Sequence, residues 1–180
     1  METELQLLNA VRSGERAAMR RLYDRYAGYA TAIALRYVSD RDAVHDVLQD
    51  SFVKILTSVD GFNYKGEGSL KGWVAAIVTH QAIDHVKRHA RIVLTDHIPD
   101  EPDVLEPDVG RVPQDVLNRL ISQLPTGYRM VLSLHVFEQM PHKEIARLLG
   151  IKPETSASQF MRAKNALAKL INNYLNSAKQ

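Results

Sequence analysis

The chain of 180 residues contains no cysteine. This absence excludes disulfide bonds, thiolate metal ligands and thiol nucleophiles, and it fits a protein that works in a reducing compartment. Long apolar runs are also missing: no segment approaches a membrane span, and the amino terminus lacks the apolar stretch of a signal peptide. We therefore expect a soluble, cytoplasmic protein without membrane insertion.

The sequence motifs of common enzymes are missing as well. There is no G-x-S-x-G elbow, Walker-type phosphate loop or G-x-G-x-x-G fingerprint, so we expect neither enzymatic activity nor a cofactor. His85 and His89 are spaced so that they can bind a metal, but no glutamate follows His85 as a zinc hydrolase helix requires. A helical hydrolase or metal-binding protein that uses these histidines stays as one alternative.

Charge is distributed unevenly along the chain. Residues 113–180 carry nine Lys or Arg against four Asp or Glu, whereas residues 95–110 carry six acids, three prolines and no base. Such an acidic, proline-containing stretch favours an extended linker over a core segment. The sequence therefore predicts an all-α fold with two small helical domains, residues 1–94 and 113–180, joined by a linker over residues 95–112.

The first domain is predicted to be helical throughout. Ser13 can cap one helix, and Asp40 or a neighbour starts another over residues 41–59. The apolar face of this second helix comprises Val44, Val47, Leu48, Phe52, Ile55, Leu56 and Val59. Its polar face comprises Asp42, Asp46, Gln49, Asp50 and Lys54. That outward row is either an ordinary solvated surface or a docking face for a basic partner helix.

A glycine-rich break over residues 61–73 carries three aromatic residues, Phe62, Tyr64 and Trp73, and leads into a helix predicted over residues 69–89. The end of that helix is crowded with Gln81, His85, Lys87, Arg88 and Arg91. Aromatic rings in a loop beside a basic helix suit single-stranded nucleic acid, because unpaired bases stack on rings while cations follow phosphates. The alternative is that Phe62 and Trp73 attach the loop to the core, which we favour for Trp73 and leave open for Tyr64.

Residues 139–170 have the layout of a helix-turn-helix. Gly150 lies where the chain must turn, and Pro153 suits the first position of the second helix. The predicted inward face of that helix comprises Ser156, Phe160, Ala163, Leu167, Leu170 and Tyr174. A neighbouring polar face of Thr155, Ser158, Gln159 and Arg162 is typical of a helix that reads the major groove. An amphipathic helix with a merely solvated face is the alternative.

These segments together resemble a bacterial RNA polymerase sigma factor of the extracytoplasmic-function (ECF) group in the sigma-70 family. The motif D-x-x-Q-[DE]-x-F appears as Asp46, Gln49, Asp50 and Phe52. The motif W-x-x-x-I-x-x-x-x-A-I-D appears as Trp73, Ile77, Ala82, Ile83 and Asp84. The motif L-P-x-x-x-R-x-V-x-x-L appears as Leu124, Pro125, Arg129, Val131 and Leu134, followed by E-I-A-x-x-L-G and R-A-K. Each motif alone is weak, but their order and spacing together are specific.

The resemblance implies a role for each segment. Polymerase-binding residues would be Asp46, Gln49, Asp50 and Lys54. Residues that read the opened −10 strand would be Phe62, Tyr64, Lys65, His80, Gln81, Lys87 and Arg88. Residues that read duplex −35 DNA would be Thr155, Ser158, Gln159, Met161, Arg162 and His135. The implied partners are core RNA polymerase, promoter DNA and an anti-sigma factor.

The chain departs from the family pattern at several positions. Where the family commonly has a Lys or Arg after a T-V pair, this chain has Ser156 and Ala157, and His80 stands where an asparagine is usual. Promoter sequence therefore cannot be copied from relatives. A rival interpretation is an ordinary helix-turn-helix transcription regulator, which would bind duplex DNA alone, commonly as a symmetric dimer, without core polymerase.

Overall fold

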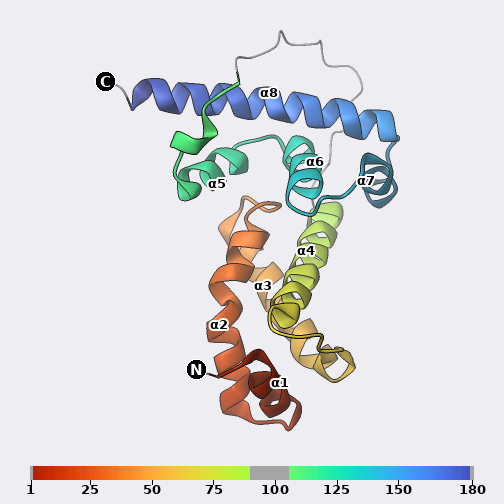
Figure 1. Ribbon diagram of the computed structural model, residues 1–180. Coiled ribbons are helices and arrows are strands. Elements are labelled where there is room, and N and C mark those ends of the chain that lie inside the picture. Colours follow the sequence, from red (N-terminus) through yellow and green to blue (C-terminus); the bar gives the residue numbers. More distant parts are fainter. Residues whose placement is uncertain (1, 90–105, 179–180) are drawn as a thin grey trace. The chain divides into compact units, whose positions relative to one another are not determined.

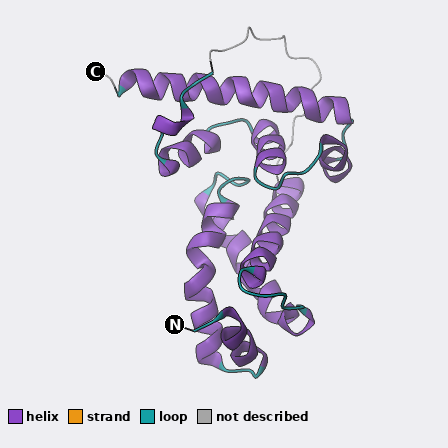
Figure 2. Cartoon of the chain, in the orientation of Figure 1, coloured by secondary structure: helices purple, strands orange, loops and turns teal. Residues whose placement is uncertain are grey.

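The computed structural model describes residues 2–89 and 106–178. Within these residues the chain forms eight α-helices and two short 3₁₀ helices, without a strand (Figures 1 and 2). The all-α prediction is confirmed. The chain divides into two compact units, Met1–His85 and Val86–Gln180. The predicted domain borders at residues 94 and 112 remain predictions, and residues 95–105 of the linker lie outside the described residues.

The first unit contains α1 to α3, a 3₁₀ turn and most of α4. Their bounds are α1 Glu4–Arg12, α2 Arg16–Ala34, α3 Arg41–Ser58, η1 Val59–Gly61 and α4 Ser69–His89. The core comes from one apolar face of each helix, including Leu7, Leu8, Leu22, Ile33, Val47, Ile55, Leu70, Val74 and Val78, all of which are buried. The helical spacing of these residues produces the apolar stripe that a surface helix needs.

The caps of these helices agree only partly with the sequence prediction. Asp40 caps α3 as expected, since its carboxylate accepts a hydrogen bond from the Ala43 amide at 2.8 Å. The prediction for Ser13 is wrong: Ser13 lies at the carboxyl end of α1, where its hydroxyl donates to the Ala10 carbonyl. Gly14 follows with φ of +81°, and α2 begins only at Arg16. A separate short helix, α1, therefore precedes the turn.

Among its described residues the second unit contains the end of α4, the 3₁₀ turn η2 Val109–Arg111 and four further helices. These are α5 Gln114–Ser122, α6 Thr126–Val136, α7 His142–Leu149 and α8 Pro153–Ser177. At 1.5 Å per residue the 25 residues of α8 span about 37 Å, which is long enough to contact all three shorter helices. Val116, Leu120 and Ile171 form one core cluster between α5 and α8, and Ile121, Leu132 and Ala163 belong to a second cluster that adds α6.

The helix-turn-helix is present as predicted. Gly150 ends α7 in the left-handed conformation with φ of +70°, which a residue with a Cβ adopts only at a cost. The Ile151 amide then donates to the Ala146 carbonyl at 3.0 Å. Pro153 occupies the start of α8, where its missing N–H costs nothing. Local sequence chemistry therefore sets the sharp turn between the two helices.

Arg129 holds the connection between α5 and α6. Its side chain is buried and donates from Nη1 to the carbonyls of Ser122, at 2.8 Å, and Leu124, at 3.2 Å. These carbonyls lie at the carboxyl end of α5, where helix acceptors lack intrahelical partners. Burial lowers the pKa of Arg129. The arginine of the L-P-x-x-x-R motif thus has a structural role in the fold.

We expect Arg129→Met to lower the free energy of unfolding by about 1.5–3 kcal/mol, because it removes hydrogen bonds to a charged group and leaves buried carbonyls without these donors. Urea unfolding followed by circular dichroism measures this loss. Arg119→Met, on the exposed side of α5, is the matched control and should change stability by less than about 0.5 kcal/mol. Equal losses in the two variants would contradict the assigned role.

Candidate nucleic-acid interface

The polar row on α3 is exposed, as the sequence predicted. Asp46, Gln49, Asp50 and Lys54 all lie at the surface. Val53, which the sequence analysis did not select, lies among them with 57% of its surface exposed. Because Val53 lies beside Gln49, Asp50 and Lys54 on the helical wheel, its exposure could have been predicted from the sequence. The row therefore combines acids with one exposed apolar side chain, which a partner could bury.

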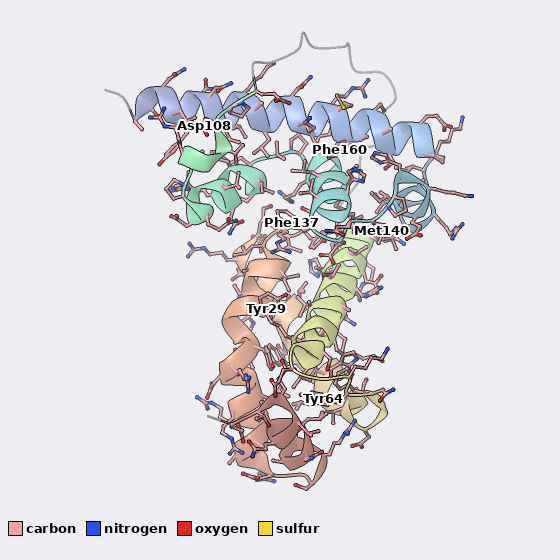
Figure 3. The ribbon with its side chains drawn as sticks, viewed as in Figure 1. Tyr29, Tyr64, Asp108, Phe137, Met140 and Phe160 are labelled. Atoms are coloured by element: carbon pink, nitrogen blue, oxygen red, sulfur yellow. The ribbon has the colours of Figure 1, made fainter. Side chains whose placement is uncertain are left out.

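Residues 62–68 form the loop between η1 and α4, the 62–68 loop, which carries the aromatic residues Phe62 and Tyr64. Phe62 stacks on Trp73 with ring centroids 4.7 Å apart, so the Phe62 ring attaches the loop to the first turns of α4. Tyr64 is half-buried and its hydroxyl donates to Glu67 at 3.3 Å (Figure 3). Burial and the negative charge of Glu67 raise the pKa of Tyr64. Lys65 is exposed, so the loop presents one cation and one tyrosine edge to solvent.

The predicted −10 residues on α4 are unequally accessible. His80, Lys87 and Arg88 are exposed, and Gln81 is half-buried. His80 Nδ1 lies 2.7 Å from the Ala76 carbonyl oxygen one turn earlier, which orients the ring along the helix. Among described residues no cluster of three or more His, Cys, Asp or Glu side chains could hold a metal ion. Nor is any helix in the described ranges long and apolar enough to cross a membrane.

The outer face of α8 differs from the prediction at two residues. Thr155 and Gln159 were expected on the polar outer face, but Thr155 is buried and Gln159 is 0% exposed. The reason is that α6 and α7 both pack on α8, so the buried face widens to the row Thr155, Gln159 and Ala163, spaced by four residues. The prediction that Gln159 lies on the exposed face of α8 is therefore wrong, and its base-reading role stays a prediction.

Three of the predicted reading residues of α8 remain accessible, namely Ser158, Met161 and Arg162. Met161 is 51% exposed, and Ser158 and Arg162 are half-buried. Ser158 donates to the Thr155 carbonyl at 3.0 Å, as serine often does within a helix. Ser158, Met161 and Arg162 lie within the first three turns of the helix, where a recognition helix contacts base edges. Their role in DNA binding remains a prediction.

A pair of histidines lies at the junction of α6, α7 and α8. His135 and His142 stack with centroids 4.3 Å apart, and the Phe160 ring meets His135 edge-on at 4.6 Å. His135 Nδ1 lies 2.9 Å from the Met140 carbonyl oxygen, and His142 Nδ1 lies 2.9 Å from Ser156 Oγ. Burial and the neighbouring His135 lower the pKa of His142. This packing therefore favours the neutral form of the His142 ring.

A buried carboxylate in the first unit was not predicted from the sequence. Glu4 is 3% exposed and accepts hydrogen bonds from the Tyr26 hydroxyl and from three amides at the start of α4. Burial by itself would raise the pKa of Glu4, but these donors outweigh burial and hold its pKa below the usual value. No local motif predicts these contacts, because Tyr26 is 22 residues from Glu4 and the three amides are more than sixty residues from it.

A helix-turn-helix in one unit and a helical bundle with an exposed polar row in the other place the chain in the class of two-unit, all-helical proteins that carry a helix-turn-helix. Comparison with known families is specific: the model of sigma-70 region 2 matches residues 22–92, and the model of sigma-70 region 4 matches residues 114–167. The chain belongs to the sigma-70 family of RNA polymerase sigma factors, in the ECF group.

Relatives align with the chain over most of its length. It is 24% identical to the RNA polymerase sigma-H factor of Pseudomonas aeruginosa, with 98% of each chain covered. It is 27% identical to the ECF sigma-E factor of Haemophilus influenzae, with 92% of this chain and 93% of that one covered. A solved structure of the sigma factor RpoE with the anti-sigma factor NepR from Bartonella quintana aligns at 20% identity over 85% of this chain and 96% of that one, with a TM-score of 0.49.

We expect the stability of the helix-turn-helix to fall as the pH drops below about 6.5, the ordinary histidine pKa. His142 has a lowered pKa when folded, so the unfolded chain takes up its proton first and gains stability relative to the folded one. Thermal unfolding at pH 7.5 and 5.5 measures this loss, and His142→Gln should reduce it. His45→Gln, exposed on α3, is the control; an equal reduction there would contradict the assignment.

Proposed function

We propose that this ECF sigma factor binds core RNA polymerase through α3, reads the opened −10 strand with the 62–68 loop and α4, and reads duplex −35 DNA with α8. It directs transcription initiation at specific promoters and acts in the cytoplasm, where polymerase and DNA are found. It has no enzymatic activity of its own in this proposal. An anti-sigma partner is expected from family membership.

The observation that carries the proposal is the exposed row on α3. An isolated acidic row would be an ordinary solvated surface, but here Val53 exposes 57% of its surface between Gln49, Asp50 and Lys54. A protein interface gains from burying such an apolar side chain, while the flanking acids select a basic partner. An ordinary transcription regulator does not need this second surface.

The two DNA-reading segments suit different forms of DNA. The 62–68 loop and α4 present Tyr64, Lys65 and His80, which fit unpaired bases and their phosphates. The start of α8 presents Ser158, Met161 and Arg162, which fit the edges of paired bases in the major groove. The high share of Lys and Arg in residues 113–180 supports attraction to duplex phosphates.

The experiment that tests the whole proposal is reconstitution with core RNA polymerase. We expect the purified chain to co-elute with core enzyme in size-exclusion chromatography, and the complex to start transcription at discrete sites on fragmented genomic DNA. Absence of co-elution, together with tight binding of the chain alone to duplex DNA, would favour the rival helix-turn-helix regulator.

Charge reversal on α3 tests the docking surface. Asp50→Lys should weaken binding of core polymerase by about tenfold or more, because like charges then face each other across the interface. Affinity is measured by fluorescence anisotropy of a labelled chain titrated with core enzyme. Asp24→Lys makes the same change on exposed α2, where Asp24 pairs with Arg20, and should leave the affinity within about twofold. Unchanged affinity of Asp50→Lys would refute the assignment.

Arg162→Ala tests the duplex-reading face of α8. Loss of a base contact should weaken binding to a −35 duplex by about 1–3 kcal/mol and relax specificity at one base pair. Lys169→Ala removes the same charge two turns later on the same helix, beyond the predicted reading surface. It should weaken binding much less and similarly for all sequences. Equal effects of the two variants on matched and scrambled duplexes would rule out base reading by Arg162.

A further inference from the structure

The 62–68 loop is held at both ends by one short helix, α1. At the carboxyl-terminal end of the loop, the side chain of Glu4 accepts hydrogen bonds from the Gly68 and Leu70 amides, at 2.8 and 3.1 Å, and from the Lys71 amide at 3.3 Å. At the amino-terminal end of the loop, Arg12 donates hydrogen bonds from Nε to the Val59 carbonyl at 3.1 Å and from Nη2 to the Phe62 carbonyl. Glu4 and Arg12 thus contact opposite ends of the same loop.

The spacing of these residues on α1 makes the double contact possible. Glu4, Leu8 and Arg12 follow each other at intervals of four, so they lie on one face of the helix. Leu8, between the two polar residues, is fully buried in the core of the first unit. The apolar residue fixes the helix against the core, and the polar residues on either side reach the loop.

The Glu4 carboxylate satisfies the first amides of α4 in place of a local cap. Helix amides at this position lack intrahelical acceptors, and a Ser, Thr, Asp or Asn before the helix normally supplies one. Here the preceding residue is Gly68, which has no side chain and adopts φ of +90°. The negative charge of Glu4 also lies at the positive end of the helix dipole.

A carboxylate is not needed to pack α1 against the core, since an apolar side chain would do so without the cost of burying a charge. The geometry shows what the carboxylate does instead. Tyr26 donates to Glu4 Oε1 at 2.9 Å, and the Glu4 amide donates to Glu67 Oε1 at 3.0 Å, while Tyr64 donates to that same Glu67. A connected set of hydrogen bonds therefore runs from α2 through Glu4 and Glu67 to the tyrosine of the loop.

We infer that Glu4, with Arg12, is a positioning residue that holds the 62–68 loop in the conformation in which it receives an unpaired base. The inference rests on the proposed role of the loop in −10 recognition. A loop ordered in advance loses less conformational entropy on binding, so promoter opening becomes more favourable. The family match to region 2 begins only at residue 22, so Glu4 and Arg12 lie outside the matched residues.

The test is a double-mutant cycle between Glu4 and Tyr64, carried out with the full chain bound to core polymerase. Glu4→Gln keeps the size of the side chain but places an amide N–H₂ where two donors now converge. We expect it to reduce the yield of permanganate-reactive open promoter by about tenfold, the scale of one hydrogen bond to a charged group. Core polymerase affinity should stay within about twofold of the parent.

Non-additivity separates positioning from a general structural role. If Glu4 acts through the loop, Glu4→Gln adds little to the defect of Tyr64→Ala in the double variant, because the group it positions is already gone. Effects that multiply in the double variant would overturn the inference and leave the loop assignment intact. A Tyr64→Ala variant with normal opening would overturn both the loop assignment and the inference.

Two further variants keep the test decisive. Glu2→Gln removes the same charge from a half-buried residue that pairs with Arg21 and does not contact the loop, and it should leave promoter opening unchanged. If Glu4→Gln does not fold, Arg12→Lys replaces it in the same cycle, since it keeps the charge but cannot reach both Val59 and Phe62 with a forked guanidinium. Additive effects of Arg12→Lys and Tyr64→Ala would then overturn the inference.

Discussion

The second unit depends on one constraint: a single helix of 25 residues, α8, must bury one face under three shorter helices and leave another face exposed. None of the short helices can bury enough apolar surface by itself. Packing of α6 and α7 on the first half of α8 encloses Thr155 and Gln159, and packing of α5 on the second half encloses Ile171. The face of α8 around Ser158, Met161 and Arg162 is therefore the part that packing of the three shorter helices leaves uncovered.

In the first unit the corresponding constraint is the polar contact between the Glu4 carboxylate and the amides at the start of α4. Leu7 and Leu8 fix α1 against the core, and Glu4 then reaches the amides that begin α4. Burial of a charge is unfavourable unless several donors meet it, and four donors meet Glu4. The same contact limits the conformations of the 62–68 loop, so the stability of the unit and the order of its loop have a common origin.

Much of the fold follows from local pattern. The cap at Asp40, the turn at Gly150 and the start of α8 at Pro153 all agree with prediction, because each depends on the chemistry of a few neighbouring residues. The outward row of α3 was also predictable, since a single apolar stripe leaves the opposite face exposed. The prediction failed at Ser13, where a short helix ends instead of a long one beginning, and at Gln159, which α6 and α7 enclose against α8.

The sequence by itself determined an all-helical chain, a helix-turn-helix, a polar row on α3 and the family to which these motifs belong. Helical periodicity and capping are encoded by residues close together in the chain, so they can be recognised without a structure. Only the tertiary structure decided which polar residues of α8 are enclosed, that Phe62 stacks on Trp73, and that Glu4 caps a helix more than sixty residues away. These features depend on contacts between distant segments, which local sequence pattern does not encode.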